Sequence, residues 1–296
     1  MSVDAPRSIG TTAIVTASYA ADFDRARILC DTMDCHVTGH ARHILLVSDR
    51  DAALFRQLAG PRREVVSESE ILPPWLHDLP DPLSLFRRRI WLSARTKPLR
   101  GWHVQQLRRI AIAAHVDEDA LLYCDSDVAF VRPFECSTLW HGQELRLFRR
   151  ENRLDEPGHG EQIAWAQHAG KVLGLPEASH PRHDYIATLI AWRNDAVRSM
   201  CDRISAVSGQ HWLESVASSR QISECMLYGR YADEVLQAAG HFHDGQELCR
   251  IYWKGPKLDG AGLSRFIADL EDHQVAIGLQ SFTGTGEDLI RKAVLG

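Results

Sequence analysis

The N-terminal half of the chain alternates short apolar runs with segments of helical periodicity. Residues 11–19, 43–49 and 63–69 are rich in Val, Ile, Leu and Thr, which is typical of buried strands. After the first of them, apolar side chains recur at helical spacing over residues 23–33. This alternation predicts an α/β fold with a mostly parallel central sheet and helices on its faces. Ligands of such sheets bind at the carboxyl ends of the strands.

A further predicted strand ends in two acids that are one residue apart. The apolar run at residues 121–124 is followed directly by Asp125-Ser126-Asp127. Because side chains alternate along a strand, Asp125 and Asp127 would point the same way, about 7 Å apart. Two carboxylates held close together repel each other unless a cation lies between them. The pair therefore suggests a hard divalent metal, although Asp-Ser-Asp is also ordinary turn chemistry after a strand.

The remaining elements are less regular. Residues 101–115 predict a helix with one apolar face, and the four prolines within residues 72–85 predict an irregular surface segment. Residues 184–195 predict a strand, and residues 223–236 a helix with Ser223 as its cap. Without a repeat or a convincing linker, residues 1–296 are interpreted as one domain with a C-terminal lobe.

Charge and cysteine usage narrow the class of protein. A net charge of −5 argues against a mainly nucleic-acid-binding protein, but the runs Arg87-Arg88-Arg89 and Arg108-Arg109 could serve a phosphate or a membrane surface. Seven scattered cysteines contain no CxxC pair, and we expect a reduced, cytoplasmic protein. No apolar stretch approaches the roughly 20 residues of a transmembrane helix. Peripheral contact with the inner membrane face stays open.

Several enzymes that use similar strands fit the sequence poorly. Haloacid-dehalogenase phosphatases also have a DxD after a strand, but they need Thr or Val where this chain has Ala129, and no later Asp pair is present. A sugar-nucleotide pyrophosphorylase or a dinucleotide-binding domain needs a glycine-rich loop after the first strand. Residues 16–24, TASYAADFD, contain no glycine. The remaining interpretation is a protein that holds a nucleotide-diphosphate donor through a metal.

Four segments carry a resemblance to a known family. They are GWHVQQLRRI (101–110), LLYCDSDVAFVRPF (121–134), IAWRND (190–195) and ISECMLYGRY (222–231). In order and spacing they resemble the GT-A glycosyltransferases, and more closely a group of uncharacterised bacterial glycosyltransferase-like proteins. The resemblance implies a GT-A fold, with a nucleotide-binding half at about 11–135 and an acceptor-binding half at about 136–296. It also implies a metal-dependent hexosyltransferase of bacterial surface polysaccharide or glycoconjugate synthesis.

The resemblance implies roles for residues near the donor, for which a UDP-sugar is expected. Asp125 and Asp127 would ligate Mn²⁺ or Mg²⁺, and a histidine of the C-terminal region, His241 or His243, could complete the metal shell. Two polar residues of the 101–115 helix would reach the donor phosphates, and two residues after the first strands would contact the nucleoside. The four are Gln106, Arg109, Tyr19 and Asp49. The alternatives to these ligand roles are a solvated surface Arg109 and a solvated histidine.

Glu224 is the expected catalytic carboxylate. With Ser223 as the cap, Glu224 falls in the first turn of its helix, where the helix dipole keeps a carboxylate ionised. It could take the proton from an acceptor hydroxyl or orient that hydroxyl, with Asp184 as the next candidate. The acceptor would be a saccharide, a lipid-linked glycan or another glycan. The alternative function is a catalytically idle nucleotide-sugar-binding or scaffold protein on the same fold.

Overall fold

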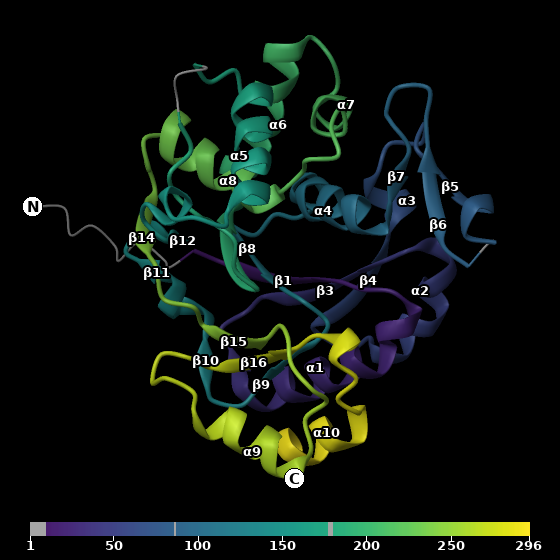
Figure 1. Cartoon of the computed structure of the whole chain (residues 1–296), viewed down its shortest axis with the longest axis vertical. Coiled ribbons are helices and arrows are strands. Elements are labelled where there is room, and N and C mark those ends of the chain that lie inside the picture. Colours follow the sequence, from purple (N-terminus) through teal and green to yellow (C-terminus); the bar gives the residue numbers. More distant parts are fainter. Residues whose placement is uncertain (1–9, 86, 177–179) are drawn as a thin grey trace, which may run out of the picture.

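The chain is built around a five-stranded central sheet (Figure 1). The computed structural model describes residues 10–85, 87–176 and 180–296. Four strands run parallel, and the fifth, β13, pairs antiparallel with β8. In sheet order the strands are β13 (Leu189–Arg193), β8 (Ala120–Cys124), β1 (Thr12–Ala17), β3 (Arg42–Val47) and β4 (Arg63–Ser67). The expected α/β fold with a mostly parallel central sheet flanked by helices is confirmed.

Helices cover both faces of the sheet because the strands are apolar on both sides. Along β1, Val15 packs in a core that includes α4 (Gly101–Ala111), whereas its neighbour Ile14 packs in a second core that includes α1 (Phe23–His36). The α4 face also carries α5 (Gly160–Val172), α6 (Asn194–Ser208) and α8 (Glu224–Arg230) (Figure 1). Strands buried on both faces read as continuous apolar runs, as the sequence predicts.

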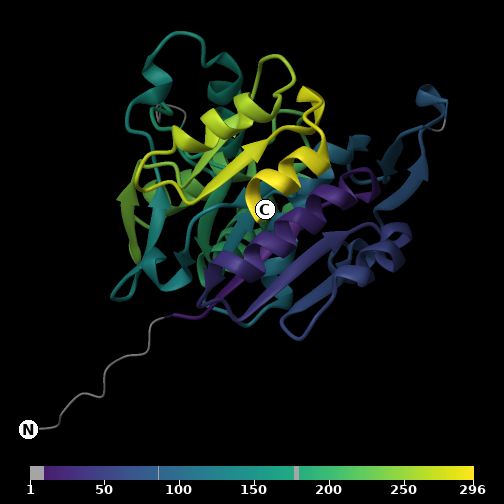
Figure 2. The ribbon, with the colours of Figure 1, turned by 90° about the horizontal axis from the view of Figure 1, so that it is seen from below.

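The predicted C-terminal lobe lies against α1. It contains a three-stranded sheet of β9 (Val128–Phe130), β16 (Ala276–Leu279) and β15 (Cys249–Tyr252), with two helices, α9 (Gly260–Ala268) and α10 (Glu287–Leu295). Figure 2 shows α10 lying along α1, where Arg25 pairs with Glu287 at 3.1 Å. β9 follows Asp127 directly, and Leu279 N, at the end of β16, donates to Asp127 O at 3.0 Å. The acid pair therefore lies where the two sheets meet.

A smaller layer completes the second half. It holds a sheet of β11 (Trp140–His141), β12 (Glu144–Phe148) and β14 (His241–Asp244). The short helix α7 (Trp212–Val216) packs elsewhere, against α6. The helix predicted over 223–236 is shorter than expected: α8 ends at Arg230 and continues as a π-helical turn over Tyr231–Val235. The strand predicted over 184–195 is also shorter, because only Leu189–Arg193 pairs with β8.

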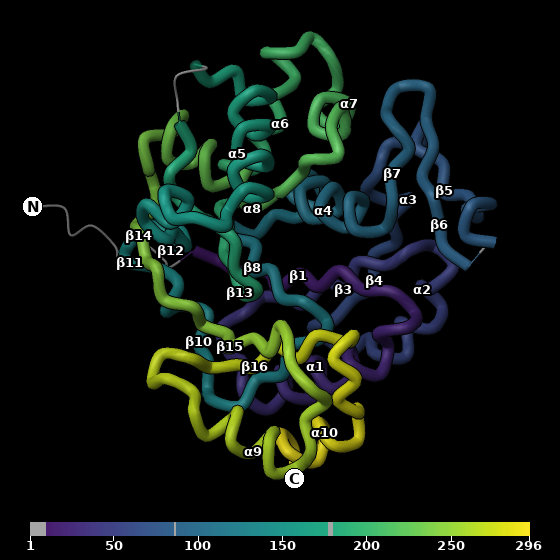
Figure 3. Tube along the Cα trace, in the orientation of Figure 1, coloured from purple at the N-terminus to yellow at the C-terminus, as the bar shows by residue number. Residues whose placement is uncertain are grey.

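The proline-rich segment 72–85 was expected to be irregular, and this prediction is wrong in part. Residues His77–Pro80 form β5, which pairs antiparallel with β6 (Arg89–Leu92), and β6 pairs with β7 (Leu99–Arg100). The tube in Figure 3 shows this hairpin projecting from the body of the molecule. The prolines are tolerated because Pro80 ends its strand and Pro82 begins a 3-10 turn.

Within the described ranges, none of the helices combines the length and the apolar character needed to cross a bilayer.

Candidate functional site

A large cavity opens at the carboxyl ends of β1 and β3. It has a volume of ≈ 590 Å³, and Ser18 and Tyr19 after β1, Ser48 after β3 and Ser126 after β8 all contribute to its wall. Serine and tyrosine hydroxyls supply hydrogen-bond donors and acceptors to this wall. The cavity therefore lies at the strand edge where the sequence predicts a ligand.

Arginine is the commonest side chain around this cavity. The lining arginines come from α2 (Asp49–Phe55), from the β5–β6 hairpin and from α4 with the residue before it: Arg50, Arg87, Arg88, Arg89, Arg100 and Arg108. The lining contains two acids, Asp22 and Asp51. Four of the arginines pair with acids, whereas Arg87 and Arg88 have no ion pair with any described residue. A wall with surplus guanidinium groups favours a phosphate or carboxylate ligand.

Asp127 is a partly buried carboxylate beside this cavity. Its Oδ1 is buried and has no hydrogen-bond partner among the described residues. Burial, reinforced by the Asp125 carboxylate and opposed by Arg25, raises the pKa of Asp127 to about 7. Asp127 lines a narrow groove together with Arg25 and Ser126, and Ser126 also lines the large cavity. An unpartnered carboxylate oxygen next to a second acid fits the oxygen donors that a hard cation prefers.

Arg109 joins Asp125 to Glu224. Its Nη1 donates to Glu224 Oε1 at 2.8 Å, and its Nη2 donates to Asp125 Oδ1. Burial disfavours the charged guanidinium, but the Asp125 and Glu224 carboxylates outweigh that effect and raise the pKa of Arg109. The side chain is 9% exposed, so Arg109 is not a solvated surface arginine.

Glu224 begins α8 in the arrangement that the sequence predicts. Ser223 Oγ accepts a hydrogen bond from Met226 N at 3.3 Å, and Glu224 is the first residue of the helix. Gln106 Oε1 accepts from Glu224 N at 3.1 Å, so α4 holds both the main chain and the side chain of Glu224. We call Gln106, Arg109, Asp125 and Glu224 the Arg109 network.

The two residues predicted to meet the nucleoside lie near the cavity. Tyr19 is 50% exposed and lines the cavity. Asp49 is exposed at the start of α2, accepts a hydrogen bond from Ser69 Oγ, and is not among the lining residues. Trp102, at the N-terminal end of α4, is also 50% exposed and lines the cavity, whereas Trp192 is fully buried in the core.

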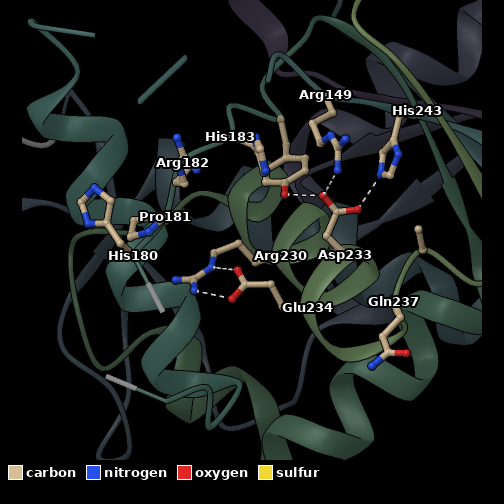
Figure 4. A pocket seen from close by; sticks show the side chains of 12 residues that line it. Arg149, His180, Pro181, Arg182, His183, Arg230, Asp233, Glu234, Gln237 and His243 are labelled. Carbon is tan, nitrogen blue, oxygen red and sulfur yellow. Dashed lines mark hydrogen bonds and ion pairs between the residues drawn. The ribbon is translucent and has the colours of Figure 1, made fainter. Parts of the chain in front are cut away.

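His243 lines a second cavity, whose wall includes neither Asp125 nor Asp127. This second cavity, of ≈ 370 Å³, is drawn in Figure 4. There His243 Nε2 is 2.6 Å from Asp233 Oδ1, and Asp233 Oδ2 also accepts from Tyr185 OH at 2.6 Å and from Arg149 Nη1 at 3.1 Å. Over the described parts of the chain, no three His, Cys, Asp or Glu side chains are grouped to hold a metal ion. The structure therefore does not bring His243 to Asp125 and Asp127.

The other two predicted residues of the second half are buried and already bonded. His241 Nε2 lies 2.7 Å from Tyr228 OH, and its Nδ1 lies 3.0 Å from Ala239 O. Asp184 Oδ1 accepts from Ile186 N at 3.0 Å, and Asp184 Oδ2 is 3.4 Å from Arg150 Nη1. Burial raises the pKa of Asp184. Neither residue lines the large cavity.

Sequence reasoning missed several residues of the large cavity. Asp22 lies five residues after β1, lines the cavity and hydrogen-bonds with Ser126; burial raises the pKa of its carboxyl, although Arg25 opposes the rise. The rule that strand ends bear ligands could have found Asp22. The same rule could have found Arg50, three residues after β3, whereas Arg100 carries no such local signal because it becomes a cavity residue only once β7 and α4 are placed.

Comparisons with known proteins give a family but no established activity. A family model described as "Family of unknown function (DUF6492)" matches residues 9–274. No curated protein matches this chain. Among solved structures, the crystal structure of an active-site mutant of LgtC is similar over 90% of this chain and 86% of that chain, with 13% sequence identity and a TM-score of 0.45. No residue role is transferred from that distant likeness.

Proposed function

The chain belongs to this DUF6492 family of unknown function, and we propose that it transfers a sugar from a nucleotide-diphosphate donor to an acceptor. One observation carries the proposal: an arginine-lined cavity adjoins a partly buried acid pair, and the Arg109 network links that pair to Glu224. An anion-binding wall, a cation site and a carboxylate beside them are the parts that such a transfer needs.

The donor would lie in the large cavity. Its diphosphate would meet the surplus guanidinium groups of Arg87 and Arg88, since charge-assisted bonds to phosphate are among the strongest hydrogen bonds in proteins. The exposed ring of Tyr19 offers a stacking surface for the base, and Asp49 would contact the ribose or base from the rim. We propose a UDP-sugar as the donor because of the resemblance to GT-A glycosyltransferases.

Asp125 and Asp127 would hold Mn²⁺ or Mg²⁺. The unpartnered Oδ1 of Asp127 is the observation that fits a cation. The bound metal would offset the charge that develops on the departing diphosphate. Arg109 holds Asp125 in place through its Nη2, and Ser126 connects the acid pair to the wall of the large cavity.

Glu224 is the proposed catalytic carboxylate. It would take the proton from an acceptor hydroxyl, or orient that hydroxyl, while the hydroxyl oxygen bonds to the sugar carbon and the nucleoside diphosphate departs. Arg109 and Gln106 fix the position of Glu224 from α4. Asp184 is the next candidate; like Glu224 it is buried and outside the cavity wall, and it lies beside Arg150.

The pathway and the acceptor rest on the resemblance alone. We propose a saccharide, lipid-linked or other glycan acceptor, and a role in bacterial surface polysaccharide or glycoconjugate synthesis in the cytoplasm.

The test is a binding screen of nucleotide sugars with and without Mn²⁺, followed by mass spectrometry of the products with candidate acceptors. Metal-dependent binding together with a glycosylated product supports the proposal. Binding without turnover indicates the alternative, a catalytically idle nucleotide-sugar-binding or scaffold protein. Hydrolysis of the donor alone contradicts transfer, and failure of every nucleotide sugar to bind contradicts both functions.

A further inference from the structure

The β5–β6 hairpin carries apolar side chains into solvent. Leu83 is 88% exposed, Leu85 75% and Leu79 44%. Leu79 lies opposite Ile90 in the antiparallel register, on the same face as the half-exposed Leu92. The other face carries Trp91, which is buried and donates from Nε1 to Glu68 Oε2 at 3.2 Å. The hairpin is thus anchored through one face and presents leucines on the other and at its end.

Hydrogen bonds and an ion pair order the end of the hairpin. Asp81 is fully buried, accepts from Leu83 N at 3.0 Å and pairs with Arg100 at 3.2 Å. Ser84 Oγ donates to Asp81 O and accepts from Arg88 N, both at 2.9 Å. Leu85 adopts a left-handed conformation with φ 52°, which a residue with a Cβ seldom takes. These contacts hold the leucines outward in a set arrangement.

Two arginines stand beside the leucines. Arg87 and Arg88 are exposed and form no ion pair with the residues that the structure describes. The nearby acids already form ion pairs with other arginines, Asp78 with Arg89 and Asp81 with Arg100. On a chain with a net charge of −5, this is a local positive surface next to an apolar one. We call Leu79, Leu83, Leu85, Arg87 and Arg88 the hairpin tip.

We propose that the hairpin tip docks on an anionic lipid bilayer. The leucines would enter the boundary between headgroups and acyl chains, and the positive charge of the arginines would attract the tip to the anionic membrane surface. A narrow projection offers little area for a stable protein interface, which typically buries about 1,200–2,000 Å², whereas a bilayer needs only inserted side chains and matching charge. Arg87 and Arg88 also line the large cavity, so docking would bring the cavity to the headgroup layer. This inference does not depend on the proposed transfer activity.

The test is sedimentation of the full chain with vesicles of phosphatidylcholine, with and without phosphatidylglycerol. The parent should bind the phosphatidylglycerol vesicles and lose that binding as salt is raised. The double variant Leu83→Ser/Leu85→Asn should lower the partition coefficient by at least about tenfold. Phe282→Ser, which removes a 73% exposed aromatic ring elsewhere, is the matched control and should leave the partition coefficient unchanged.

Three outcomes would overturn the inference. They are a parent that binds neither kind of vesicle, a double variant that binds vesicles like the parent, and a Phe282→Ser control whose partition coefficient falls as much as that of the double variant. Thermal unfolding of each variant checks that folding is intact, which we expect because the substituted side chains are exposed. Analytical ultracentrifugation tests the alternative that a second copy of the chain binds the hairpin tip. Self-association that the double variant abolishes, in a parent that does not bind vesicles, would assign the tip to that second copy.

Discussion

Arg109 Nη1 lies 2.8 Å from Glu224 Oε1, across 115 positions of the sequence. The same guanidinium donates to Asp125, so one buried cation balances two carboxylates from α8 and from the end of β8. Removing one partner of a buried ion pair leaves the other charge uncompensated, which costs more than the pair itself contributes. Arg109 therefore links the proposed cation site to the proposed catalytic carboxylate.

Arg109→Met should destabilise the fold by about 3–5 kcal/mol, because Asp125 and Glu224 would face each other without a counter-charge. Urea unfolding measures the loss. The double variant Arg109→Met/Glu224→Met is the control, and it should lose less than the single variant because one of the two uncompensated acids is gone. A single variant as stable as the parent would show that the network does not balance charge.

Asp127→Asn should remove the effect of metal on ligand binding. In the parent, UDP with Mn²⁺ should raise the melting temperature more than UDP with EDTA, because the cation links the carboxylates to phosphate. The variant should show no difference between the two conditions. Asp24→Asn changes an acid that is 70% exposed and serves as the control. Equal stabilisation of the parent with and without metal contradicts the cation site.

Arg87→Ala and Arg88→Ala should each weaken binding of a nucleoside diphosphate by about 1.5–3 kcal/mol, since each would lose a hydrogen bond between charged groups. Isothermal titration calorimetry at two salt concentrations measures the change, which should shrink at the higher one. Arg56→Ala removes an exposed arginine outside the cavity wall and should leave the dissociation constant alone. Unchanged affinity in both hairpin variants would place the phosphates elsewhere.

Glu224→Gln keeps the shape of the side chain and removes its charge. Donor affinity should survive while transfer falls by roughly 10²-fold or more, as expected for loss of a general base. Product formation measured with saturating donor separates the two effects. Asp184→Asn provides the comparison at the other candidate acid. Transfer at near the parent rate in Glu224→Gln, with loss in Asp184→Asn, would move the catalytic role to Asp184.

His241 should make the protein less stable in mild acid. Burial lowers the pKa of His241 to about 4, and its ring already bonds to Tyr228 OH and Ala239 O. Between about pH 6.5 and pH 4 the unfolded chain binds a proton that the folded chain excludes. The free energy of unfolding should therefore decrease by about 3 kcal/mol as the pH is lowered from about 6.5 to about 4. His241→Gln should flatten this part of the unfolding free energy against pH. His77→Gln, at an exposed position, should not.

The sequence determined the elements whose pattern is local. Apolar runs set β1, β3 and β8, strand order along the chain implied a parallel sheet, and Asp125 and Asp127 followed from the end of β8. Ser223 was readable as a cap because its bond to Met226 N spans three residues. Such features depend on neighbours in the chain, so periodicity and residue type suffice to predict them.

Tertiary structure alone decided which distant side chains meet. Arg109 reaches Glu224 because α4 and α8 pack on the same face of the sheet, and His243 lies beside Asp233 rather than Asp127 because β14 pairs with β12. The proline-rich segment became a hairpin because β6 supplies a partner strand, which no local pattern reveals. Ion pairs of buried groups depend on the placement of whole elements, and the alternation of strands and helices leaves that placement open.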